Sequence, residues 1–438
     1  MRTILQRHLL PLAAIAALGL GLFAGSVSAP AAESTGQNEI ARYLAGLQPA
    51  AGSPVATFTN DPAWRQHAAA FDQAWGRFEK AQLSRIRAWR GQHLTSHRPT
   101  LLYFFSGPDY LYADAFFPEA TTYVLAGLEP IGPIPQVTAA NRGALPALRA
   151  SLNSVLNLSF FRTREMRQRL SGGAFAGTLP LLYIFLARAG KTVEAVSLVR
   201  LNADGVAGPA EGPAARGEVN GVKIVFTDAA SGMARSAGTV HAPAAAIVGP
   251  AKPEAIGSEP SKSDAKPVEG KPIETGPVEP NPVEAKPVEA KPETAQLVPA
   301  PTRRTLYYFQ GDVSNAGPGL DALQAFCRAL GPADGFVKSA SYLMHIGGFS
   351  KIRDFLLAQT QLILEDDSGI PAQYFSPGSW DLSPYGRYLG PISLFPGRRQ
   401  RQLDDLYKSA SPRPLDFGIG YRFHQNESNL LLAVKRPQ

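Results

Sequence analysis

The chain has a single cysteine, Cys327, among its 438 residues. No disulfide can form within the chain, so its folded part has to be stabilised by a conventional hydrophobic core. Such a core is feasible because 45% of the residues are hydrophobic. Long apolar runs are scarce after the N-terminus. The most apolar later segment, residues 178–189, is shorter than the roughly 20 residues that a transmembrane helix needs.

Sequence signatures of familiar chemistry are missing too. The chain contains no Gly-x-Gly-x-x-Gly turn after a predicted strand, no phosphate-binding loop, no nucleophile elbow, no His-Glu-x-x-His and no EF-hand loop. A single cysteine excludes zinc sites built on several thiolates. The spacing of His93 and His97 suits one helix face, but a metal site needs a third ligand. Pro99 indicates the alternative, a polar helix end. We therefore expect no metal and no cofactor.

Strong charge of one sign is also absent. The formal net charge is +7, and the basic residues are dispersed along the chain. This excess is too small and too scattered to indicate nucleic-acid binding. It is compatible with attraction to an anionic polymer of the cell envelope.

The N-terminus has the three parts of a secretory signal peptide. Basic residues come first, residues 9–23 are apolar, and small residues follow. Cleavage after Ala31 removes a signal peptide of residues 1–31, and cleavage after Ala29 is the alternative. An uncleaved N-terminal anchor is a further alternative. We expect a periplasmic or secreted protein with no transmembrane segment after signal cleavage.

Composition changes abruptly over residues 231–302. Proline recurs at every fifth position from Pro267 to Pro292, and the segment contains no aromatic residue. It offers too little apolar surface to offset the entropy of folding, so we predict a disordered Pro/Glu/Lys-rich insertion. Residues 219–228 and 304–309, which flank it, both have the pattern of strands. We predict that they pair antiparallel and that the insertion replaces their hairpin loop.

This organisation predicts one α/β domain made of residues 59–230 and 303–438, preceded by a flexible segment at residues 32–58. The alternative is two domains joined by the Pro-rich segment. Residues 100–105 and 121–126 are apolar strands with a helical stretch between them, which is the order that a parallel sheet requires. The predicted fold class is α/β, with a mixed parallel and antiparallel sheet and flanking helices.

Several further elements are predicted from hydrophobic periodicity. The Asn-Asp-Pro sequence at residues 60–62 predicts the start of a helix that continues to about residue 92. After the insertion we predict helices at residues 320–330, 336–344 and 349–364. A terminal hairpin is predicted from residues 415–423 and 428–434.

Polar residues follow two of the predicted strands, where ligands of open α/β sheets are bound. They are Ser106, Asp109 and Asp114 after the first strand, and Asp312, Ser314 and Asn315 after the strand that follows the insertion. If the two strands are parallel in one sheet, these side chains face one cleft. Paired carboxylates there suit acid/base catalysis or a divalent cation. The alternative is structural, because turns and helix caps need the same residue types.

A second group of candidates lies near the C-terminus. Asp366 and Asp367 follow the predicted helix 349–364, where acidic side chains oppose the helix dipole. Arg353 or Arg387 are candidate partners for these acids, and His345 is the candidate general base. Residues 380–391, which include Arg387 and Tyr388, mix aromatic and turn-forming residues. Such a loop suits sugar or peptide contacts, or packing on the core.

Two function classes remain open. In the first, the chain is an exported cell-envelope binding or assembly protein without a cofactor, and its partner is an anionic polymer or another envelope protein. In the second, it is a hydrolase-like periplasmic enzyme that uses carboxylates at strand ends. The sequence leaves open whether the chain is an enzyme.

Overall fold

The structure, a computed structural model, describes residues 31–94, 97–158, 173–228, 302–423 and 427–437. The predicted signal peptide and the predicted insertion lie outside these residues, apart from Ala31 and Thr302. No helix in this part of the chain is long and apolar enough to cross a membrane.

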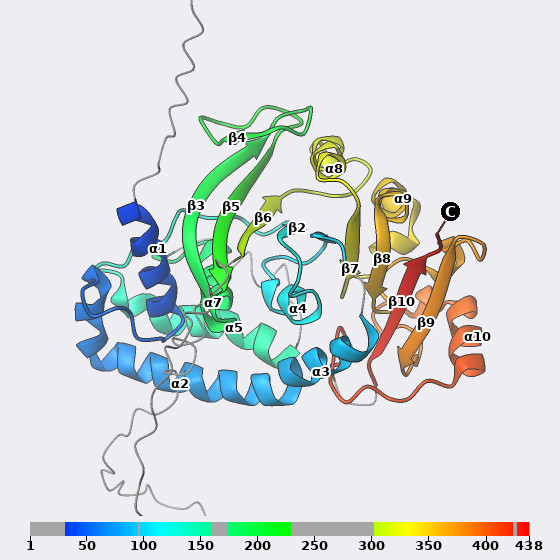
Figure 1. The fold of residues 1–438 in the computed structure, drawn as a ribbon, viewed down its shortest axis with the longest axis horizontal. Coiled ribbons are helices and arrows are strands. Elements are labelled where there is room, and N and C mark those ends of the chain that lie inside the picture. Colours follow the sequence, from blue (N-terminus) through cyan, green and yellow to red (C-terminus); the bar gives the residue numbers. More distant parts are fainter. Residues whose placement is uncertain (1–30, 95–96, 159–172, 229–301, 424–426, 438) are drawn as a thin grey trace, which may run out of the picture. The chain divides into compact units, whose positions relative to one another are not determined.

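One ten-stranded sheet runs through the described part of the chain (Figure 1). Its strands are β1 (Thr100–Tyr103), β2 (Thr122–Gly127), β3 (Lys191–Leu201), β4 (Ala207–Pro209), β5 (Val219–Asp228), β6 (Arg303–Gln310), β7 (Ala333–Val337), β8 (Thr360–Glu365), β9 (Trp380–Gly386) and β10 (Asn429–Lys435). Their order across the sheet is β4-β3-β5-β6-β2-β1-β7-β8-β10-β9.

The middle of the sheet is parallel and its two sides are antiparallel. Strands β6, β2, β1, β7 and β8 run in one direction. Antiparallel pairing then adds β5, β3 and β4 on one side and β10 and β9 on the other. The predicted α/β class with a mixed sheet and flanking helices is therefore confirmed. All four residues of β1 are buried, as expected for a parallel strand covered on both faces.

The two faces of the sheet carry separate hydrophobic cores. Leu101 and Tyr103 of β1 belong to the first core, and Leu102 belongs to the second, because successive side chains of a strand point to opposite faces. The helices of the first face are α1 (Ala31–Leu44), α2 (Pro62–Phe78), α3 (Ser84–His93), α4 (Tyr110–Phe116), α5 (Leu145–Leu158) and α7 (Leu179–Arg188). Those of the second face are α8 (Leu320–Ala329), α9 (Ser350–Gln359) and α10 (Arg401–Ala410).

The long helix predicted at residues 62–92 is confirmed. It consists of α2, a π-helical turn η2 (Glu79–Leu83) and α3 without a break. The Asp61 carboxylate accepts a hydrogen bond from the Ala63 amide at 2.8 Å, and Pro62 occupies the first helical position. The first turn of a helix leaves backbone amides unpaired. The Asp61 carboxylate accepts from one of them, and Pro62 has no amide N–H to pair.

Residues 32–58 are not the flexible segment that the sequence predicted. They contain α1 and the 3-10 helix η1 (Pro54–Asn60), and Tyr43 and Leu44 are fully buried. The Trp64 indole N–H donates to the Tyr43 carbonyl at 3.0 Å. The Ser-Thr-Gly stretch at residues 34–36 and Asn38 weaken the local helix signal, and packing against α7 and β3 orders the helix.

The strands on either side of the insertion pair as predicted. β5 and β6 are antiparallel neighbours, in a register that extends to Thr227 opposite Arg303. Lys191 Nζ and Arg304 Nη2 lie 2.7 and 2.9 Å from the two carboxylate oxygens of Asp228. These ion pairs hold the strand ends together at the point where the insertion begins and ends. On its other side, β6 pairs with β2.

Of the helices predicted after the insertion, the one at residues 336–344 is wrong and the one at residues 349–364 is too long. Within residues 336–344, the chain completes β7 and then forms a loop with a 3-10 turn, η5 (Leu343–His345). Within residues 349–364, α9 ends at Gln359 and β8 begins at the next residue. Both segments are short apolar runs, whose periodicity does not distinguish a buried strand from a helix. The parallel pairing of β7 with β8 decides the outcome.

The predicted terminal hairpin is also wrong. β10 pairs with β8 and β9, whereas residues 415–423 contribute only an isolated bridge between Ile419 and Arg422. The true partner, β9, contains Pro384, which lowers its strand propensity. Proline is tolerated there because β9 is at the edge of the described sheet.

Candidate functional site

After the neighbouring strands β1 and β7, the chain continues on opposite faces of the sheet. The chain leaves β1 into α4 on the first face and leaves β7 toward α9 on the second face. The loops that follow β1 and β7 therefore diverge, at a topological switch point. In open α/β sheets, ligands bind at this point, beyond the carboxyl ends of the strands. We call the end of the sheet where β6, β2, β1, β7 and β8 finish the carboxyl edge.

A buried ion pair occupies the switch point. Lys338, the residue after β7, places Nζ 2.9 Å from Asp109 Oδ2, and their side chains are 1% and 2% exposed. The Tyr103 hydroxyl donates to the same carboxylate oxygen at 2.8 Å. Asp109 also caps α4, and the Lys338 ammonium lies 4.1 Å from the centre of the Tyr112 ring. The pair thus ties both diverging loops together.

Three consecutive acidic residues, Glu365, Asp366 and Asp367, end β8 beside this pair, and all three are buried. Asp366 accepts hydrogen bonds from the amides of Ser339 and Ser368 at 2.9 and 3.0 Å. Burial raises the pKa of Asp366. Burial and the neighbouring Asp366 charge raise the pKa of Asp367 to about 6. We refer to Asp109, Lys338, Asp366 and Asp367 as the acidic cluster.

The loop after β7 has an unusual backbone. Ser339, Ser341 and Tyr342 have φ values of 55°, 52° and 55°, in the left-handed region that non-glycine residues rarely adopt. The Tyr421 hydroxyl fixes this loop by donating to the Ser339 carbonyl at 2.8 Å and accepting from the Ser341 amide at 3.0 Å. Strained backbone of this kind concentrates at functional sites.

The carboxyl edge lacks the elements of a phosphate site. Such sites use glycine amides at the start of a helix. Here the turn after β1 contains Pro108, which has no N–H, and the helix cap is the negatively charged Asp109. After β2, Glu129 is buried and receives the Tyr308 hydroxyl on its carbonyl at 2.9 Å. No group of three or more potential metal ligands occurs among the described residues.

Four of the residues predicted from the sequence lie in or next to the acidic cluster. Asp109, Asp366 and Asp367 belong to the acidic cluster. His345 lies next to it, with its ring 5.2 Å from the Tyr342 ring. Burial lowers the pKa of His345 to about 4, so its imidazole is neutral at pH 7. Asp366 and Asp367 follow a strand rather than the predicted helix end, so no helix dipole opposes them.

The other candidate residues make local structural contacts. Asp114 lies on the first face in α4, paired with Lys191 at 2.9 Å. Asp312 accepts the Ser314 amide at 2.8 Å in an exposed turn. Asn315 donates to the Gly347 carbonyl at 2.8 Å.

Arg353, Arg387, Tyr388 and Ser106 are likewise separate from the acids. Arg353 donates to the Met344 carbonyl at 3.2 Å, Tyr388 accepts the Gln400 amide at 3.0 Å, and Ser106 donates to the Gly107 carbonyl at 2.8 Å. Arg387 is exposed. The predicted ion pairs of Arg353 or Arg387 with Asp366 or Asp367 are therefore not formed.

His93 and His97 do not share one helix face. α3 ends at His93, whose ring packs on Tyr385 with the ring centres 4.7 Å apart. His97 Nε2 lies 2.7 Å from the Leu94 carbonyl oxygen. These contacts favour the polar helix end over the metal site.

A basic segment begins at the same edge of the sheet. β9 and β8 are both antiparallel to β10, so the end of β9 lies at the carboxyl edge. Residues 387–422, here called the arginine segment, contain seven arginine or lysine residues and three aspartates. Arg387, Arg401 and Arg413 are exposed, and none has a hydrogen bond or ion pair from its side chain within the described residues.

The arginine segment covers the acidic cluster. The Ile392 amide donates to the Tyr342 hydroxyl at 3.3 Å, and that hydroxyl donates to Asp367 Oδ2 at 2.7 Å. Arg422 Nη2 donates to the Gly390 carbonyl at 2.9 Å. On the outer side of the same loop, Leu394 is 79% exposed. The arginine segment therefore exposes Leu394 and three arginines that have no partner among the described residues, and a hydrogen bond to Tyr342 fixes it on the acidic cluster.

The chain matches no protein-family model, and no curated protein or solved structure matches it.

Proposed function

We propose that the chain is an exported binding protein of the cell envelope, and that the arginine segment binds an anionic polymer without a cofactor. The guanidinium groups of Arg387, Arg401 and Arg413, which are exposed and have no partner among the described residues, carry this proposal. The signal-like N-terminus supports export, and the local excess of basic residues supports an anionic partner.

The chemistry of arginine fits such a partner. A guanidinium group presents a planar fork of donors that matches carboxylate, phosphate or sulfate groups, and it stays charged at every physiological pH. Arg387 and Arg413 are held near each other because the Gly386 amide donates to the Arg413 carbonyl at 3.0 Å. Repeated anionic groups along a polymer can engage several arginines at once, which raises the overall affinity beyond that of one ion pair.

The acidic cluster has a supporting role in this proposal. Its carboxylates are saturated by internal donors: Asp109 by Lys338 and Tyr103, and Asp367 by Tyr342 and by Asn429 at 3.1 Å. These bonds fix the loops on which the arginine segment rests. A fixed surface loses little conformational entropy on binding.

The triple substitution R387Q/R401Q/R413Q should weaken binding of the purified chain to heparin, an anionic polysaccharide probe, by about tenfold at low salt. Three exposed ion pairs of about 0.5 kcal/mol each account for this factor. Binding of the unmodified chain should also weaken steeply as salt rises, because the contacts are screened. Surface plasmon resonance on immobilised heparin measures both effects, with neutral dextran as the blank surface.

The matched control is R77Q/K80Q/R216Q, which removes the same charge from three exposed positions without side-chain partners in the described part of the chain. It should retain most of the affinity. Equal loss in both variants would show that net charge alone drives binding, and the proposal would then be wrong. Salt-insensitive binding would favour another envelope protein as the partner.

A hydrolase is the second candidate, favoured by the raised pKa of Asp367 at the switch point. A carboxylate with a pKa of about 6 is suited to act as a general base near neutral pH. Activity on p-nitrophenyl esters or glycosides should then rise with pH through about 6. Asp367→Asn should lower kcat at least 100-fold, whereas Asp312→Asn, in the exposed turn, should leave it unchanged. Equal turnover by both variants would exclude this candidate.

A further inference from the structure

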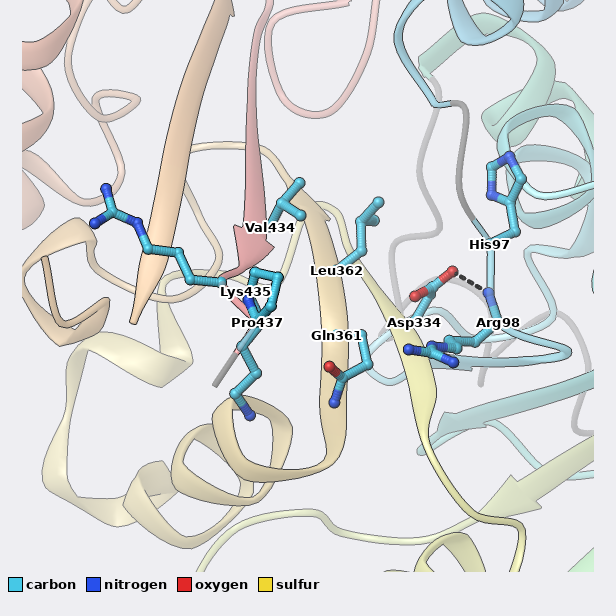
Figure 2. A pocket seen from close by; sticks show the side chains of 9 residues that line it. His97, Arg98, Asp334, Gln361, Leu362, Val434, Lys435 and Pro437 are labelled. Carbon is cyan, nitrogen blue, oxygen red and sulfur yellow. Dashed lines mark hydrogen bonds between the residues drawn. The ribbon is translucent and has the colours of Figure 1, made fainter. Parts of the chain in front are cut away.

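A cavity of about 440 Å³ lies at the opposite end of the parallel strands (Figure 2). Asp334, near the start of β7, and Gln361, near the start of β8, line it together with residues from the end of β10. Its volume falls within the range of small-molecule sites, roughly 300–1,000 Å³. The acidic cluster and the arginine segment contribute nothing to this cavity.

Asp334 is the buried anion of the cavity, with 2% of its surface exposed. The Arg98 backbone amide donates to Asp334 Oδ2 at 2.8 Å. Within the described residues no hydrogen bond reaches the other carboxylate oxygen, Oδ1. Burial raises the pKa of Asp334 to about 6, so the group is mainly ionised at pH 7. Because Asp334 lines the cavity, its second carboxylate oxygen is free to accept a hydrogen bond from water or from a ligand there.

Two further polar groups line the cavity, Arg98 and Gln361. The positive charge of Arg98 opposes the effect of burial on the pKa of Asp334. The Arg98 guanidinium and the Gln361 side-chain amide make no hydrogen bond or ion pair within the described part of the chain. Figure 2 shows Arg98 and Asp334 beside each other, and the side chains of Gln361 and Leu362 extending in opposite directions from the neighbouring strand β8. An acceptor for a cation and a donor for an anion are therefore adjacent.

Leu362, Val434 and Pro437 form the apolar part of the remaining wall, which His97, Lys435 and Arg436 complete. The charged groups of the last two residues are engaged elsewhere: Lys435 Nζ donates to the Leu357 carbonyl at 2.9 Å, and Arg436 pairs with Asp381. A ligand that satisfies all three features has a donor for Asp334, an anionic acceptor for Arg98 and an aliphatic part for the apolar wall.

We propose that this cavity binds an aliphatic α-amino acid. Its ammonium group is placed to donate to Asp334 Oδ1, its carboxylate to accept from Arg98, and its side chain to pack on Leu362 and Val434. Ammonium and carboxylate are joined through one carbon atom in such a ligand, which matches the adjacency of Asp334 and Arg98.

Isothermal titration calorimetry of the full chain with L-leucine tests the proposal. Saturable binding with one site is expected at pH 7. 4-Methylpentanoate, which lacks the ammonium group, and 3-methylbutylamine, which lacks the carboxylate, should each bind at least tenfold more weakly. Absence of saturable heat with leucine would overturn the proposal. Equal binding of 4-methylpentanoate would also overturn it, since the cavity would then be a simple anion site.

Two substitutions locate the binding. Asp334→Asn preserves the shape of the side chain and should lower the affinity for leucine at least tenfold, and Arg98→Gln should do the same. Arg98 is exposed, so this second variant tests the site even if the buried substitution impairs folding. Asp321→Asn, at a side chain that is 81% exposed on α8, is the matched control and should bind normally. Unchanged affinity in R98Q would place the leucine elsewhere.

Discussion

Replacing Lys338 with methionine is expected to lower the free energy of unfolding by about 3–5 kcal/mol, because it leaves the Asp109 carboxylate buried without its cation. Both side chains are almost completely inaccessible, so water cannot take over the role of the ammonium group. Methionine has a similar length and keeps the apolar contacts of the lysine stem. The contact of the ammonium with the Tyr112 ring is lost as well. Guanidinium chloride denaturation followed by circular dichroism measures the change.

The double variant D109N/K338M separates charge from packing. Asparagine keeps an oxygen that can cap α4 but has no charge to desolvate, so the double variant should be more stable than K338M alone. Lys351→Met is the control, because Lys351 and its partner Asp321 are 52% and 81% exposed. It should change stability by less than about 1 kcal/mol. A double variant no more stable than K338M would mean that the pair acts through shape and not through charge.

Acidification from pH 6.5 to 4 is expected to remove about 3 kcal/mol of stability through His67. Burial lowers the pKa of His67 to about 4 from an unfolded value of 6.5. The unfolded chain therefore takes up a proton at a higher pH than the folded chain does. The stabilisation is complete above pH 6.5 and disappears as the pH falls toward 4. Arg149 and Arg188 repel the protonated ring and add to the effect.

His67→Gln should abolish this part of the pH dependence. Glutamine can still donate to the Leu44 carbonyl, which lies 2.9 Å from His67 Nε2. The quantity to compare is the difference in unfolding free energy between the two proteins at pH 7, 5.5 and 4.5. His345 titrates in the same range, and Asp334 and Asp367 act in the opposite direction, but these contributions are common to both proteins. Parallel pH curves would contradict the assignment to His67.

The sequence predicted the strongly periodic and strongly apolar elements of the fold. Within residues 100–105, the buried strand β1 (Thr100–Tyr103) formed where five hydrophobic residues, 101–105, follow one another shortly before a Gly-Pro turn. The pairing of residues 219–228 with 304–309 followed from two strand patterns of similar length on either side of the Pro-rich segment. In each case, local composition and the final packing favour the same structure.

The region after the insertion was harder to predict, because tertiary contacts decide its structure. Residues 360–365 continue the apolar pattern of the helix before them, and only the pairing with β7 and β10 makes them a strand. Lys338 was overlooked for the same reason. In the predicted helix 336–344, nothing distinguished Lys338 from a lysine on the surface. As the residue after a buried strand, it lies in the core.

The candidate site was partly predictable. Acids after strands are visible in a sequence, and Asp109, Asp366 and Asp367 do converge. Asp312 follows a parallel strand too, but β2 and β1 separate its strand from β7. The adjacency of Arg98 and Asp334 had no sequence signal, since the two residues are 236 positions apart and become neighbours only through the parallel pairing of β1 with β7.

The place of β6 in the sheet has a consequence for folding. The residues before the insertion provide β1 to β5, yet β5 and β2 are separated by β6, which is made only after the insertion has been synthesised. Until then, β5 and β2 each expose a row of unpaired backbone groups, a state prone to wrong pairing between chains. Closing this gap requires contacts between residues far apart in the sequence, which slows folding. The two parts of the sheet that precede the insertion in the sequence are therefore joined through a strand that follows it.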